Sequence, residues 1–166
     1  MSKEERHIFS VLVENRFGVL ARVAGLFSGR GFNIDSLNVA ETHDKSISHM
    51  TLVTHGDAQI IEQIYQHLNR LIDVIEVKDL TTAGTHVERE LVLIKVATDD
   101  PQKRTEILQV AEVFRGRVID MKPASLVLEI TGDEGKLKAA IDIFNTYGIL
   151  ELSRTGKVAM TRGATK

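Results

Sequence analysis

The sequence predicts an α+β fold made of two tandem ferredoxin-like sandwiches, each with helices on one face of an antiparallel sheet. Strand-length runs of β-branched and aromatic residues alternate with stretches of helical spacing, in the order βαββαβ. This order occurs twice along the 166 residues, and a polar stretch without a clear period separates the two copies. We therefore expect a first domain at residues 1–80, a linker at 81–89, a second domain at 90–155 and a flexible tail at 156–166.

The first copy begins with a strand at residues 8–14 and a turn at residues 15–18. A helix follows, whose expected apolar face is Leu20, Val23, Ala24 and Phe27. Strands are expected at 34–41 and 47–55 around a polar hairpin turn. Asp57 is a good N-cap for the second helix, and residues 73–80 form the closing strand. The apolar residues of that second helix are Ile60, Ile61, Ile64, Leu68 and Leu71.

The second copy repeats this order. Asp100 and Pro101 begin its first helix, where proline costs no hydrogen bond, and Asp133 caps its last helix. The expected strands are residues 91–97, 117–122, 125–131 and 149–154. Each copy is only about 75 residues long, so its core is thin and its open sheet surfaces favour pairing with another subunit.

Composition excludes several classes of protein. The formal net charge of −2 argues against a chain that neutralises nucleic-acid phosphates, and the absence of cysteine excludes disulfides and thiolate chemistry. The first residues are charged, and no apolar run approaches the roughly 18 to 20 residues that span a bilayer. We expect a cytoplasmic protein without membrane contact. Because no nucleophile, base and orienting group can be assembled, we expect no catalytic residues and no enzyme.

The two copies differ at their first turns, and this difference indicates where a ligand could bind. The first copy has Asn15 and Gly18 before its first helix and Asn33 after it, whereas the second has Gln102 and Thr105 at the positions of Asn15 and Gly18. Backbone N–H groups at a helix start lack partners and suit a carboxylate.

The expected donors are the amides of Gly18, Val19 and Leu20, and a glycine allows close approach to the backbone. The side-chain amides of Asn15 and Asn33 could hold an α-carboxylate or an α-amino group. On residue types alone, an equally good interpretation is that Gly18 makes only a tight turn and Asn33 only ends a helix.

Three segments carry a resemblance to a known family. Residues 15–23 (NRFGVLARV) and 27–37 (FSGRGFNIDSL) resemble the ACT domain of the small regulatory subunit of acetolactate synthase, also called acetohydroxyacid synthase. Residues 86–91 (HVEREL) resemble the segment between its domains, and Phe114-Arg115-Gly116 with Ile119-Asp120 resembles its second domain. The likeness extends over nearly the whole chain.

The resemblance implies a non-catalytic subunit that activates a separate catalytic large subunit and confers feedback inhibition, usually by valine, in branched-chain amino-acid biosynthesis. Thiamine diphosphate, magnesium and FAD would belong to the catalytic subunit, and this chain would hold no cofactor. Two ACT domains would pair side by side as a homodimer with the effector between them. Carried over, Asn15, Gly18, Val19 and Leu20 would come from one subunit, and Asn33 and Ile34 from the other.

Two other functions fit part of the pattern. A free-standing ACT-type regulator of transcription would need a helix-turn-helix, which is not evident. A ferredoxin-like RNA-binding module would need aromatic residues on the central strands, but residues 48–55 contain none. His43, His49 and His55 recur near one hairpin, but without evident carboxylate partners they are a weak metal candidate, so no metal site is expected.

Overall fold

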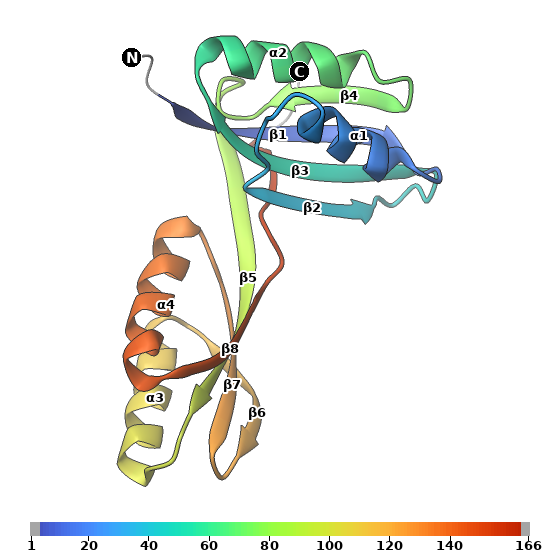
Figure 1. Ribbon diagram of the computed structural model, residues 1–166. Coiled ribbons are helices and arrows are strands. Elements are labelled where there is room, and N and C mark those ends of the chain that lie inside the picture. The colour runs from blue at the N-terminus through green and yellow to red at the C-terminus, as the bar shows by residue number, and fades with distance from the viewer. Residues whose placement is uncertain (1–3, 164–166) are drawn as a thin grey trace. The chain divides into compact units, whose positions relative to one another are not determined.

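A computed structural model describes residues 4–163, which divide into two compact units. The first unit contains the chain up to Glu88 together with the segment from Lys157 onward, and the second unit is Arg89–Gly156. Both units have the predicted βαββαβ order (Figure 1). Among the described residues, no helix combines the length and the apolar character that crossing a membrane requires.

The first unit is an antiparallel sheet with strand order β2-β3-β1-β4, and its two helices pack on one face. Phe9, Val11 and Val13 of β1 face these helices, and they pack with Phe27 of α1 and Ile64 of α2, all buried. The elements of this unit are β1 (Glu5–Glu14), α1 (Val19–Ser28), β2 (Ser36–Glu41), β3 (Ile47–Gly56), α2 (Ala58–Asn69) and β4 (Val74–Asp79).

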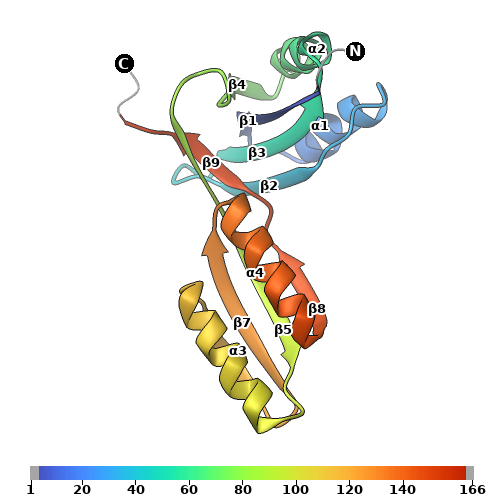
Figure 2. The same cartoon turned by 90° about the vertical axis from the view of Figure 1, so that its left-hand side faces the viewer.

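The second unit repeats this arrangement with strand order β6-β7-β5-β8. Figure 2 shows α3 and α4 along one face of its sheet. Phe144 of α4 is fully buried in the core between the helices and the strands. Its elements are β5 (His86–Ala97), α3 (Pro101–Val113), β6 (Arg117–Lys122), β7 (Ser125–Gly132), α4 (Glu134–Tyr147) and β8 (Ile149–Arg154). The predicted fold class is confirmed.

Two local predictions differ from the structure. Strand β5 begins at His86, which is inside the residues predicted as a linker. This strand is long enough to pair with a further strand from the C-terminal segment as well as with β7 and β8. Leu20, predicted to lie on the apolar face of the first helix, is 43% exposed. The buried face of α1 is instead Val19, Val23, Leu26 and Phe27.

The segment predicted as a flexible tail contains a further strand, β9 (Val158–Thr161), which pairs with β5. It lies on the side of the first sheet opposite α2 (Figure 2). There Ala159 packs with the buried side chains of Ile8, Val53 and Leu80. Residues 164–166 of that predicted tail, like residues 1–3 of the first domain, lie outside the described residues.

Hydrogen bonds hold β9 in place. The Lys157 N–H donates to Ser36 Oγ over 3.0 Å, and the Ala159 N–H donates to the buried Thr51 Oγ1 over 3.2 Å. The Arg162 N–H donates to the carbonyl of Thr85 over 2.9 Å. The prediction of a flexible tail was therefore wrong for β9, because the residues that bond to this strand and pack against it are far away in the sequence.

Candidate functional site

The start of α1 differs from the start of the other described helices. Its N-cap is Gly18, in the left-handed conformation with φ 81° and ψ −2°, and no side chain caps it. At the starts of α2, α3 and α4, Asp57, Asp100 and Asp133 each accept a hydrogen bond from a backbone N–H of the first turn. In the second repeat the Asp100 side chain therefore bonds to the first-turn amides of α3, whereas no side chain bonds to those of α1 in the first repeat.

The amides of this first turn are only partly used. The Val19 N–H donates to the Arg16 carbonyl over a long 3.3 Å, and the Val19 side chain is buried in the core. No hydrogen bond between described residues uses the N–H of Gly18 or Leu20. Of the three predicted donors, Gly18 and Leu20 are therefore available to a ligand, whereas Val19 already has a partner.

Arg22 is a residue of this turn that the sequence analysis missed. A Cβ placed on Gly18 would lie 3.2 Å from the Arg22 Nη1, so the guanidinium lies directly against the glycine. The Arg22 Nε donates to Asp73 Oδ2 over 2.7 Å, and Asp73 is itself buried. The signal was available, because Arg22 follows Gly18 by four positions, which is one helical turn.

Asn15 ties the turn to the neighbouring hairpin. Its Nδ2 donates to Glu41 Oε1 over 3.0 Å and to the Lys45 carbonyl over 2.9 Å, and its backbone N–H donates to the Ser46 carbonyl over 2.7 Å. Both amide hydrogens of its side chain are thus engaged. What Asn15 can still offer a ligand is its Oδ1, which accepts hydrogen bonds.

Asn33 and Ile34 lie in the loop between α1 and β2. The Asn33 Nδ2 donates to Asp35 Oδ1 over 2.7 Å, and the Asn33 carbonyl accepts from the buried Thr54 Oγ1 over 2.6 Å. Ile34 is half-buried and packs against the core. Asn33 therefore has one amide hydrogen directed to Asp35, and its side-chain oxygen can still accept a hydrogen bond from a ligand.

The sheet register places these two groups far apart within one chain. The Asn15 turn follows Glu14, which pairs with Ile47, whereas the Asn33 loop is bonded to Thr54, which pairs with His7. His7 and Glu14 are seven positions apart on β1, or about 23 Å at roughly 3.3 Å per residue. One copy therefore does not bring Asn33 and Ile34 to Gly18 and Leu20.

Comparisons with known proteins agree with this architecture. Residues 9–76 match the family described as the AHAS small subunit-like ACT domain, and residues 89–163 match the family described as the small subunit of acetolactate synthase. The chain is 51% identical to the acetolactate synthase small subunit of Aquifex aeolicus over 157 residues, covering 95% of this chain and 81% of that one. It belongs to the acetolactate synthase small-subunit family.

Further relatives support the same assignment. A probable acetolactate synthase small subunit of Archaeoglobus fulgidus is 51% identical over 97% of this chain and 99% of its own. The crystal structure of the acetolactate synthase small subunit from Thermotoga maritima superposes with a TM-score of 0.88 at 38% identity, covering 97% of this chain and 99% of that one. The resemblance predicted from the sequence is confirmed, and the chain is a regulatory rather than a catalytic subunit.

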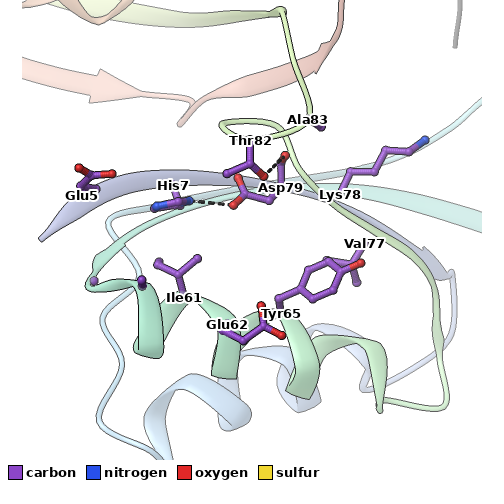
Figure 3. Close-up of a pocket in the computed structure, with 12 residues that line it drawn as sticks. Glu5, His7, Ile61, Glu62, Tyr65, Val77, Lys78, Asp79, Thr82 and Ala83 are labelled. Carbon is purple, nitrogen blue, oxygen red and sulfur yellow. Dashed lines mark hydrogen bonds and ion pairs between the residues drawn. The ribbon is translucent and has the colours of Figure 1, made fainter.

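A cavity of 760 Å³ lies elsewhere in the first unit, between β4 and α2 (Figure 3). Its wall contains His7 and Asp79, whose Nδ1 and Oδ2 atoms lie 2.8 Å apart, and Ile61 and Tyr65 of α2 face them. None of the six predicted effector-binding residues lines it. The cavity is therefore distinct from the open turn at Gly18.

The three histidines that the sequence analysis placed near one hairpin, His43, His49 and His55, are not brought together in the structure. His49 Nε2 lies 2.8 Å from Ser10 Oγ, and His55 Nδ1 lies 2.6 Å from Asp35 Oδ2. His49 and His55 are six positions apart on β3, about 20 Å at roughly 3.3 Å per residue. No cluster of three or more potential ligands occurs within residues 4–163. Partial burial lowers the pKa of His49, which favours its neutral form.

Proposed function

We propose that the open turn at Gly18 of one copy and the Asn33 loop of a second copy together bind valine, and that this binding controls the catalytic subunit of acetolactate synthase. The observation that carries the proposal is the uncapped start of α1, with the N–H groups of Gly18 and Leu20 free among the described residues and Arg22 beside them. Donors and a positive charge at one point favour a carboxylate.

The other groups suit the rest of the amino acid. The side-chain oxygens of Asn15 and Asn33 can accept hydrogen bonds from an α-ammonium group. The side chain of Leu20 is 43% exposed and that of Ile34 is half-buried, so both offer apolar surface to a small aliphatic side chain. Hydrogen bonds to charged groups contribute about 1.5 to 3 kcal/mol each, so a few of them hold a small zwitterion.

A two-fold pairing through β2 would complete the site. Strand β2 is an edge of its sheet and runs from the Asn33 loop at Ser36 to Glu41, whose carboxylate holds Asn15. If two β2 strands pair antiparallel across a two-fold axis, the Ser36 end of one copy meets the Glu41 end of the other. Each Asn33 loop then approaches the Gly18 turn of its partner, and an isologous dimer has two equivalent sites.

Regulation then follows by linkage. Valine must bind one arrangement of the dimer, or of its complex with the catalytic subunit, better than another, since equal affinity for both shifts nothing. Couplings of about 1 to 3 kcal/mol are typical and change an affinity roughly 5- to 150-fold.

Titration calorimetry of the full chain with valine, leucine and isoleucine tests the proposal, with D-valine as the stereochemical control. We expect saturable heat with the L-amino acid and about one site per chain, because each two-fold interface forms two sites. Sedimentation should show a dimer at the same concentration. The absence of saturable heat with all three L-amino acids would contradict the effector assignment.

Replacing Asn33 with alanine is expected to weaken valine binding by roughly tenfold, since one hydrogen bond to a charged group is lost. The side chain is exposed and bonds only to the exposed Asp35, so the melting temperature should change little. Asn145→Ala, on the exposed surface of α4, is the matched control and should bind valine as the wild type does. An unchanged valine affinity in Asn33→Ala would remove this side chain from the site.

A further inference from the structure

A basic groove lies between α1 and α2 in the first unit, with a volume of 400 Å³. Three of its residues, Arg22, Leu26 and Arg30, follow one another at four-residue spacing, which puts them on one side of α1 and its C-terminal extension. The last turn of α2 supplies the opposite wall. The residues of the basic groove are Arg22, Leu26, Arg30, His67, Arg70 and Leu71.

The positive charge of this groove is largely uncompensated. Asp73 is the ion-pair partner of Arg22, but in the described part of the chain the side chains of Arg30 and Arg70 have no ion-pair partner, and both residues are exposed. The pKa of His67 lies below its usual value, first because desolvation disfavours its charged form and then because Arg30 and Arg70 repel its proton. This concentration of cations is local, since the whole chain has a formal net charge of −2.

The shape and chemistry of the groove suit carboxylate side chains. Leu26 and Leu71 form an apolar floor on which the methylene groups of a glutamate could lie. A guanidinium binds a carboxylate through two parallel N–H···O bonds, and Arg30 and Arg70 are free to do so. Arg70 caps the C-terminal end of α2, where the helix dipole favours a cation and helps hold the positive wall in place.

We propose that the basic groove docks an acidic segment of the catalytic subunit. The inference rests on the proposed function for one step, the link to the effector. Arg22 lies in the groove and also against Gly18, so its guanidinium contacts both the place of the effector carboxylate and the place of the acidic segment. A change at one of these two places therefore alters the charge available at the other, and this gives the effector a direct route to the catalytic partner.

Charge reversal in the full chain tests the docking surface. Binding of Arg30→Glu and Arg70→Glu to the catalytic subunit would be measured by interferometry at low and at physiological salt. We expect each reversal to weaken binding about tenfold or more and to reduce its dependence on salt, because a favourable pair becomes a repulsive one. Lys138→Glu, an exposed cation of α4 in the second unit, is the matched control and should change binding by less than about twofold.

Two further measurements separate the outcomes. Circular dichroism melting shows whether a variant is folded, and Arg30→Gln with Arg70→Gln provides milder replacements that should weaken binding in the same direction. Calorimetry with valine should give the wild-type affinity in all groove variants. Loss of docking with intact valine binding supports the groove. Intact docking in the reversals together with no valine binding by the wild type would overturn the groove and the effector proposal alike.

Other results would overturn the docking proposal alone. Unchanged binding in both reversals would do so, as would equal weakening by Lys138→Glu, since that would be a general effect of net charge. Inorganic pyrophosphate is the probe for a small anion. If it binds the wild type and not Arg30→Glu while the catalytic subunit binds both equally, the groove is a small-anion site instead.

Discussion

Reconstituted enzyme containing Gly18→Asp is expected to remain activated by the small subunit and to lose inhibition by valine. The new carboxylate would stand where the effector carboxylate is proposed to bind, 3.2 Å from Nη1 of Arg22 at its Cβ. It would neutralise that guanidinium and repel the incoming anion. The loss of two hydrogen bonds to a charged group, at about 1.5 to 3 kcal/mol each, corresponds to an affinity reduced by a hundredfold or more.

The control for this substitution must share its backbone strain. Gly163 has φ 80°, close to the 81° of Gly18, and an added Cβ there meets no atom within 4 Å. Gly163→Asp therefore adds the same charge at a similar positive φ away from the turn, and it should leave valine inhibition intact. The measurement is acetolactate formation by the reconstituted enzyme as valine is titrated. Retained inhibition in Gly18→Asp would place the effector elsewhere.

Ala159→Asp is expected to destabilise the first unit by about 3 kcal/mol or more. Ala159 is 5% exposed and packs with Ile8, Val53 and Leu80, so the substitution places a carboxylate without a partner in an apolar cluster. If β9 detaches to relieve this burial, the three side chains become exposed to water and the hydrogen bonds to Ser36 and Thr51 are lost. Calorimetric unfolding and hydrogen exchange of the β1 and β3 amides would report the effect.

The neighbouring residue offers a matched control. Met160 lies on the same strand but is 63% exposed, so Met160→Asp should change the free energy of unfolding by no more than about 0.5 kcal/mol. If the two aspartates lower stability equally, β9 does not protect the sheet as the structure describes.

The helices of this protein were predictable in place and in their buried faces. Apolar residues at helical spacing identified α2 through Ile61, Ile64 and Leu68, all buried as predicted, and Asp57, Asp100 and Asp133 cap helices as predicted. Helices and paired strands are local patterns, so short windows of sequence carry their signal. The exposed Leu20 is the exception, because the buried face of α1 includes Val19 and Leu26 and does not include Leu20.

Strand β9 could not be predicted in the same way. Its four residues alternate between exposed and buried, but a short stretch with Val158 and Ala159 has little strand signal of its own. It is fixed by hydrogen bonds to Ser36 and Thr51 and by packing on Ile8 and Val53, all of which lie more than a hundred positions earlier in the chain. Burial of this kind depends on distant partners and not on the local sequence.

For the effector site, the comparison of the two repeats identified the turn and the structure changed the roles of its residues. The sequence singled out Gly18, whereas only the structure shows that Val19 bonds to Arg16 and that Asn15 bonds to Glu41. The four-residue spacing of Arg22 from Gly18 is visible in the sequence, but the contact of its guanidinium with Gly18 is shown by the structure.

By itself, the sequence determined the two βαββαβ repeats, their family and the turn that differs between them, because periodicity, caps and glycine positions act over a few residues. The tertiary structure alone decided that Asn33 lies at the other end of the sheet from Gly18. The Asn33 loop is next to His7 and the Gly18 turn follows Glu14, and these two residues are seven positions apart on the extended strand β1. The tertiary structure also decided that β9 covers the sheet and that Arg22, Arg30 and Arg70 share one groove. The physical reason is that these relations depend on how strands register and helices pack, which joins residues far apart in the chain.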